Sequence, residues 1–163
     1  MQLKQFLELF NPYPGNNFIE VSTKLSETTV ALKNLLNQTD STLELVFYSQ
    51  NESKLPDTFQ DSKVQTINTF EKTFRAFPRS ADIIILKDIF YIHKNKDLLL
   101  KTSYHALANT ANIIIMEKKD ILDKNEMYQF LEKYEFRATN FIDIIDGYDL
   151  VMAKKMHMWG NGL

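Results

Sequence analysis

The sequence contains no cysteine, so disulfide bonds, thiolate metal sites and a cysteine nucleophile are excluded. It also lacks an excess of one charge, because 19 basic residues nearly balance 21 acidic ones and the net charge is −2. Such a balance creates no field that favours nucleic acid or an anionic membrane. No stretch reaches the ~18 uninterrupted apolar residues of a membrane span, and the N-terminus does not resemble a signal peptide. We therefore expect a soluble, cytoplasmic protein with no membrane partner.

Several common site patterns are missing as well. The chain has no GxSxG, HExxH, P-loop or EF-hand pattern. Glycine is scarce, with 4 residues among 163, and glycine supplies the positive φ angles that phosphate-binding turns require. We expect no metal site, and nothing in the sequence supports a nucleic-acid partner.

What the chain does contain is an alternation of strands and helices. Short apolar runs rich in β-branched residues predict strands, and apolar residues spaced three and four apart predict helices. This alternation favours a mostly parallel sheet with helices on both faces. The predicted strands are 18–23, 43–49, 63–70, 82–86 and 111–117, and the predicted helices are 3–10, 26–38, 94–107 and 123–136.

The last part of the chain has a different pattern. Two apolar runs, 141–145 and 150–153, flank the pair Asp146-Gly147, which is typical of a tight hairpin turn. We expect two antiparallel strands joined at this pair. At least one strand of the otherwise parallel sheet is then antiparallel.

This order of elements resembles the class I S-adenosylmethionine-dependent methyltransferase family. Segment 81–119, "ADIIILKDIFYIHKNKDLLLKTSYHALANTANIIIMEKK", resembles the family's fourth strand, the helix after it and the fifth strand. The run "MYQFLEKYEF" resembles the family's Glu/Ala-Gly-Phe phrase, with Glu135 in place of glycine, and "DGYDLVMAKKM" resembles its final strand. The resemblance implies a Rossmann-like methyltransferase fold with a seven-stranded, mostly parallel sheet. Its last strand would run antiparallel between the fifth and sixth.

The cofactor motif of that family follows its first strand as an acidic residue and three glycines. Here the register keeps the acid as Glu20 but places Ser22, Lys24 and Ser26 at the glycine positions. By the resemblance, these four residues are the candidates to bind S-adenosylmethionine. Glu20 would anchor the ligand or be an ordinary strand-end carboxylate. Lys24 would pair with an anionic ligand group, lie in solvent, or fill the methionine pocket.

Two more family positions have changed. An acidic residue at the end of the second strand holds the ribose hydroxyls in the family, whereas this chain has Ser49 or Gln50 there, with Glu52 further on. The Gly-Gly turn before the fifth strand is replaced by Thr110 and Ala111. If all the losses together cost ~4 kcal/mol, binding would weaken about a thousandfold, from micromolar to millimolar. We therefore expect poor affinity for S-adenosylmethionine.

Candidate catalytic residues follow the fourth strand, where the family places groups that face the reacting methyl. Asp88, Tyr91 and His93 can exchange protons or hydrogen-bond, and an acid–base group there would take a proton from the attacking nucleophile. The alternative is a polar loop between a strand and a helix. At least one of the three should line the cleft at the carboxyl edge of the sheet if the chain is an enzyme.

Together these features predict one methyltransferase-like domain over 1–163, with a helix and linker at 1–15 and a tail at 157–163. We expect an S-adenosylmethionine-dependent methyltransferase-like protein with weakened or lost cofactor binding. Its acceptor would be a small molecule or a protein, and a homo-oligomer or a protein partner fits the sequence too. The alternative is a non-catalytic protein that keeps the fold for protein–protein interaction.

Overall fold

The computed structural model describes residues 3–49 and 55–156. Gln50 and the tail at 157–163 fall outside the described residues. In chain order the elements are α1 (Leu3–Leu7), β1 (Asn17–Ser22), α2 (Glu27–Gln38), β2 (Thr42–Tyr48), the 3-10 helix η1 (Asp57–Phe59), β3 (Val64–Ile67), β4 (Ala81–Lys87), α3 (Lys96–Ala106), β5 (Leu107–Lys118), α4 (Lys124–Lys133), β6 (Phe136–Ile142) and β7 (Tyr148–Lys155).

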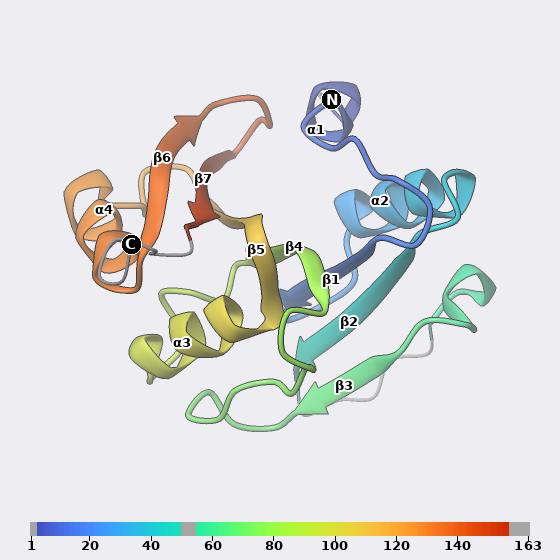
Figure 1. The fold of residues 1–163 in the computed structure, drawn as a ribbon, viewed down its shortest axis with the longest axis horizontal. Helices are drawn as coiled ribbons and strands as arrows, with labels where there is room; N and C mark the ends of the chain where they lie inside the picture. Colours follow the sequence, from blue (N-terminus) through green and yellow to red (C-terminus); the bar gives the residue numbers. More distant parts are fainter. Residues whose placement is uncertain (1–2, 50–54, 157–163) are drawn as a thin grey trace.

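The strands form one seven-stranded sheet in the order β3-β2-β1-β4-β5-β7-β6, with β3 and β6 at its two edges (Figure 1). Strands β1 to β5 pair in parallel. β7 lies antiparallel between β5 and β6. The predicted fold class, including the position of the antiparallel strand, is confirmed.

Each face of the sheet carries its own apolar core and its own helices. Alternate residues of β1 and β4 point to opposite faces, so Phe18 and Ile85 belong to one core while Ile19 and Ile84 belong to the other. α1 and α2 cover the first face through Phe6, Leu32 and Leu36. α3 and α4 cover the second face through Leu99, Leu100, Met127 and Leu131. The prediction of helices on both faces is therefore confirmed.

The connections on the β3 side of the sheet are unusually sparse in helix. Only η1 is described between β2 and β3, and residues 68–80 run from β3 to β4 as a loop without a helix (Figure 1). Pro78 lacks a backbone N–H and disfavours a helix across the end of this loop. Within the described ranges no helix is both long and apolar enough to cross a bilayer.

The predicted hairpin is correct in direction and wrong in its bounds. β6 ends at Ile142 and β7 begins at Tyr148, so residues 143–147 form a longer connection than a two-residue turn. Ile145 is buried against the core instead of pairing with β7. Gly147 closes the connection with φ +82°, and its carbonyl accepts the N–H of Lys119 at 2.9 Å.

At two positions where the methyltransferase family has glycine, this chain has another residue with a left-handed backbone conformation. Thr110 has φ 67° within a bulge of β5, and Glu135 has φ 66° just after α4. Because a Cβ in the left-handed region costs roughly 1–2 kcal/mol, we expect Thr110→Gly and Glu135→Gly each to raise the free energy of unfolding by about 1 kcal/mol. The melting temperature should rise by about 2–4 °C in each case, measured by circular dichroism.

A neighbouring position supplies the control for this prediction. Asn109 is exposed like Thr110, lies in the same strand and has no positive φ. Asn109→Gly should therefore lower the stability by about 0.5–1 kcal/mol, since it only adds freedom to the unfolded chain. Equal effects of glycine at 109 and 110 would show that backbone strain is not stored at Thr110.

Candidate functional site

The sheet has a topological switch point between β1 and β4. The chain runs outward from β1 through β2 to β3, and returns to place β4 on the other side of β1. Ligands of open α/β sheets bind in the crevice outside the carboxyl ends of the strands at such a point. Val21 pairs with Leu86, so Ser22 and Lys87 end their strands side by side at this crevice.

The turn after β1 is built without glycine and without left-handed residues. No residue of 23–26 has a positive φ, and each of these residues is described. The Ser22 hydroxyl donates to the Lys24 carbonyl at 3.1 Å, and Ser26 caps α2 in a reciprocal arrangement with Thr29. The Lys24 side chain is exposed. The hydroxyls of Ser22 and Ser26 therefore stabilise the turn itself.

Glu20 is the most unusual group at the crevice. Its side chain is 1 % exposed, its Oε2 accepts the Thr29 hydroxyl at 2.5 Å, and its Oε1 has no hydrogen-bond partner. Burial raises the pKa of Glu20 to about 7, against the opposing effects of the Thr29 hydrogen bond and the charge of Lys87. A buried carboxyl oxygen without a partner is costly in an isolated protein, and a ligand N–H or ammonium group would satisfy it.

A second polar group sits beside it, at the end of β4. Lys87 Nζ lies 3.5 Å from Asp88 Oδ2 and 4.9 Å from the centroid of the Tyr148 ring. The Tyr148 hydroxyl donates to the same oxygen of Asp88 at 2.7 Å, and burial together with this bond raises the pKa of Tyr148. Asp88 has φ 56°, a strained backbone of the kind that gathers at functional sites.

Glu117, one residue before the end of β5, lies on the opposite face of the sheet from Lys87 and holds the loop after β4. Its Oε2 accepts the backbone N–H of Phe90 at 3.2 Å. Burial and the charge of Asp88 raise the pKa of Glu117 to about 7. The carboxylate therefore holds the loop that carries Asp88 in place.

The three candidate catalytic residues are placed in three different settings. Asp88 lies at the crevice with Lys87 and Tyr148. The hydroxyl of Tyr91 accepts the Asp123 N–H at 3.0 Å, at the N-terminus of α4. His93 is 1 % exposed within the core on the α3 and α4 face. The structure thus brings Asp88, but not Tyr91 or His93, into contact with the other polar residues of the crevice.

His93 holds the helix-free loop 68–80 against the sheet. Its Nδ1 accepts the Asn95 N–H at 2.9 Å, so Nε2 carries the proton and donates to the Lys72 carbonyl at 2.9 Å. The Tyr48 hydroxyl donates to the same carbonyl at 2.7 Å. Burial lowers the pKa of His93, which keeps the ring neutral near pH 7. These contacts give His93 a positioning role for the loop.

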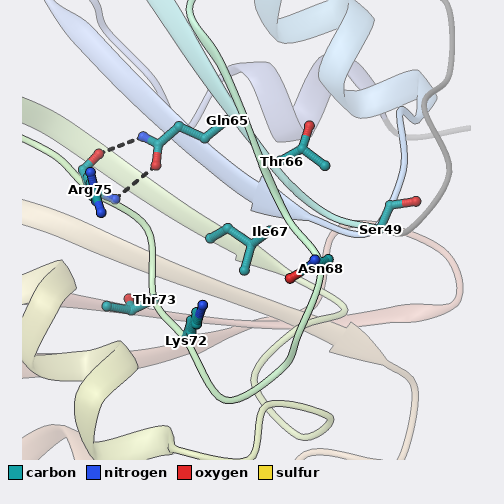
Figure 2. A pocket seen from close by; sticks show the side chains of 8 residues that line it. All are labelled: Ser49, Gln65, Thr66, Ile67, Asn68, Lys72, Thr73 and Arg75. Atoms are coloured by element: carbon teal, nitrogen blue, oxygen red, sulfur yellow. Dashed lines mark hydrogen bonds between the residues drawn. The ribbon is translucent and has the colours of Figure 1, made fainter.

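The loop and the ends of β2 and β3 enclose a pocket of about 750 Å³ (Figure 2). Ser49, the described residue at the predicted ribose position, lines it. The full lining is Ser49, Gln65, Thr66, Ile67, Asn68, Lys72, Thr73 and Arg75. Gln50, the other candidate at this position, is outside the described residues.

Sequence reasoning missed Lys87, Glu117 and Tyr148. The first two are the polar residues that end the buried runs "DIIIL" and "NIIIM", so the change from apolar to charged at a strand end was an available signal. Tyr148 gave no such signal. It reaches Asp88 only because β7 inserts beside β5 and pairs Tyr148 with Lys118.

The comparisons with known proteins agree on the fold. No family model matches the sequence, and no curated protein matches it at a significant level. Many solved structures match, including a putative S-adenosylmethionine-dependent methyltransferase from Methanococcus maripaludis, with a TM-score of 0.72 and 15% identity over 95% of this chain and 84% of that one. A putative methyltransferase from Haloferax volcanii, solved in complex with the Trm112 methyltransferase activator, matches with a TM-score of 0.69 and 11% identity over 96% and 89%.

A third match is much longer than this chain. Phosphoethanolamine N-methyltransferase 2 from Haemonchus contortus, in complex with S-adenosylmethionine, gives a TM-score of 0.69 and 12% identity over 96% of this chain and 52% of that one. The chain therefore spans about half the length of some of these structures and most of others. At such low identity the likeness concerns the fold, which is that of the class I methyltransferases.

Proposed function

We propose that this chain binds S-adenosylmethionine in the crevice between β1 and β4 and uses it for methyl transfer. The observation that carries the proposal is the buried Oε1 of Glu20, which has no hydrogen-bond partner among the described residues and lies two residues before the end of β1. The α-ammonium group of the cofactor is a donor of the kind that this oxygen lacks. The methyltransferase fold of the chain supports the same assignment.

The expected affinity is low. The hydroxyls of Ser22 and Ser26 are engaged within the turn, and Thr29 already holds the other oxygen of Glu20. Few donors and acceptors of the turn are left for the ligand. We propose a Kd of about 0.1–1 mM, which corresponds to roughly 4–5.5 kcal/mol of binding free energy.

When bound, S-adenosylmethionine supplies an electrophilic methyl group for in-line displacement. The chain contributes mainly positioning, which is the larger part of catalysis in such transfers. In this proposal the Asp88 carboxylate faces the acceptor and takes its proton, while Tyr148 and Lys87 hold that carboxylate in position. Tyr91 and His93 would support the loop instead of touching the acceptor.

The acceptor is proposed to be a small molecule or a protein, and the location to be the cytoplasm, in keeping with a chain that has no cysteine. The Haloferax volcanii neighbour is described in complex with an activator protein. A protein partner is accordingly part of the proposal here, alongside a homo-oligomer.

A thermal-shift measurement tests the proposed binding. S-adenosylhomocysteine at tenfold its Kd should stabilise the folded chain by about 1.4 kcal/mol and raise the melting temperature by about 3–5 °C. Glu20→Gln should reduce this shift, whereas Glu8→Gln, at an exposed position of the chain near α1, should leave it unchanged. No shift at about 5 mM ligand would favour the non-catalytic interaction protein.

A further inference from the structure

The pocket between loop 68–80 and the ends of β2 and β3 has an unusual charge. Lys72 and Arg75 line it, and no described lining residue carries a carboxylate. A smaller adjoining pocket of about 270 Å³ shares Ser49, Ile67 and Asn68 with it and adds Lys94. The end of β2 therefore opens onto a polar region that contains only positive charge among its described lining residues.

Among the described residues, none of the three cations has a side-chain partner. Within residues 3–49 and 55–156, the side chains of Lys72, Arg75 and Lys94 form no ion pair and no hydrogen bond. Surface cations often pair with a nearby acid, as Lys119 does with Asp143 at 2.6 Å. Three unpaired cations around a pocket suit an anionic ligand.

The backbone that carries these cations is fixed by specific contacts. The Gln65 side-chain amide donates to the Arg75 carbonyl at 2.5 Å and accepts the Arg75 N–H at 2.9 Å, as the dashed lines in Figure 2 mark. The Lys72 carbonyl accepts hydrogen bonds from the buried Tyr48 and His93. The backbone of the loop is therefore held in one conformation before a ligand binds. This lowers the free-energy cost of ordering the loop on binding.

The place of the pocket suggests which molecule carries the anion. In dinucleotide-binding α/β domains an acidic residue after the second strand binds the free ribose hydroxyls, whereas a nearby arginine accommodates a phosphate on the ribose. Here Ser49 directly follows β2, and Arg75 and Lys72 line the same pocket (Figure 2). A phosphate dianion forms strong, charge-assisted hydrogen bonds with both side chains.

We infer that this pocket binds a phosphate group carried on the ribose of an adenine nucleotide, seated at the same crevice as S-adenosylmethionine. The inference rests on the proposed function for the position of the adenosine. S-adenosylmethionine has no ribose phosphate and would leave the pocket unused. Nucleotides with a 2′- or 3′-phosphate would occupy both regions and compete with the cofactor.

Calorimetric titration in phosphate-free buffer tests this inference with four probes: adenosine 2′,5′-bisphosphate, adenosine 3′,5′-bisphosphate, adenosine 5′-monophosphate and inorganic phosphate. One of the bisphosphates should bind at least about tenfold more tightly than the monophosphate, which corresponds to 1.4 kcal/mol. The double variant Lys72→Ala/Arg75→Ala should abolish this preference. Lys101→Ala/Lys118→Ala removes the same charge from exposed positions outside the pocket and should preserve it.

The outcomes separate the inference from the proposed function. Equal affinity for the bisphosphates and the monophosphate would overturn the inference, as would inorganic phosphate binding as tightly as a bisphosphate. Binding of S-adenosylhomocysteine without any preference for ribose phosphate would overturn the inference and leave the proposed function standing. A bisphosphate preference that depends on Lys72 and Arg75, without binding of S-adenosylhomocysteine, would support the inference and refute the proposed cofactor.

Discussion

Glu20→Gln is expected to make the protein more stable at pH 8 by about 3 kcal/mol and to leave its stability at pH 4 nearly unchanged. The folded state holds the carboxyl proton up to a pKa of about 7, whereas the ordinary pKa of a free glutamate side chain is 4.5. Between these two values the unfolded chain has lost a proton that the folded chain retains, so stability falls as pH rises by up to about 1.4 kcal/mol per pH unit. Above pH 7 the buried carboxylate is ionised and its full cost is present.

The glutamine variant has no proton to lose and still offers an oxygen to the Thr29 hydroxyl. Urea unfolding from pH 4 to pH 9 measures the effect as the difference between the two pH profiles. Glu117 also has a raised pKa and contributes to the profile of both proteins, so only the difference reports on Glu20. Superimposable profiles would mean that Glu20 is not a strained buried acid.

Lys87→Met is expected to lower the stability at pH 8 by about 3 kcal/mol. Lys87 is 7 % exposed. Its ammonium group forms an ion pair with Asp88 and interacts electrostatically with the carboxyl group of Glu20. Methionine keeps most of the side-chain volume and removes the charge, which leaves the buried Glu20 and the half-buried Asp88 without this cation. At pH 5 the loss should be smaller, because Glu20 is then protonated.

A double-mutant cycle with Glu20→Gln checks the physical reason for this effect. If the two groups interact, Lys87→Met should cost less in the Glu20→Gln background than in the wild type, with a coupling of at least 0.5 kcal/mol. Additive effects would show that the charge of Lys87 acts on Asp88 alone. A neutral Lys87→Met at every pH would contradict the described electrostatics of the crevice.

Much of the fold could be predicted because short sequence segments identify its central strands. The run "DIIIL" and the run "NIIIM" are too apolar and too β-branched to be anything other than buried strands, and the alternation around them indicates a parallel sheet. The end of the hairpin could not be predicted from local signals. Ile144 and Ile145 continue the apolar pattern of β6 but pack from a loop into the apolar cluster that contains Leu150.

The candidate site could be predicted only where it follows from strand position. Glu20 could be identified because it matches the acidic residue of the family motif, and Asp88 because it directly follows β4. Their partners come from other elements, Thr29 from α2 and Tyr148 from β7. No spacing in the sequence predicts these contacts. Histidine is a common catalytic residue type, so the sequence made His93 a candidate. Only the structure shows that it hydrogen-bonds the Lys72 carbonyl of loop 68–80.

The glycine losses also have a different physical meaning from the one that the sequence suggested. Phosphate-binding turns require positive φ angles that glycine supplies, but residues 23–26 after β1 contain no positive φ. The non-glycine residues with positive φ that the structure describes lie outside this turn and are Asp40, Arg79, Asp88, Thr110, Asp120, Glu135 and Ala138. We therefore expect cofactor binding to be weakened for two reasons other than backbone strain. The hydroxyls of Ser22 and Ser26 already hydrogen-bond within the turn, and side chains in place of glycine keep the backbone further from the ligand.

Isothermal titration of the wild-type chain with S-adenosylhomocysteine tests the central claim most directly. We predict saturable one-site binding with a Kd of about 0.1–1 mM, and binding at least about tenfold weaker for Glu20→Gln, because that variant loses the ionised acceptor near the end of β1. Lys24→Gly should change the affinity little, since the Lys24 side chain is exposed. Absence of saturable heat at about 5 mM ligand, or equal affinity of the wild type and Glu20→Gln, would contradict the claim that the β1 and β4 crevice is an S-adenosylmethionine site.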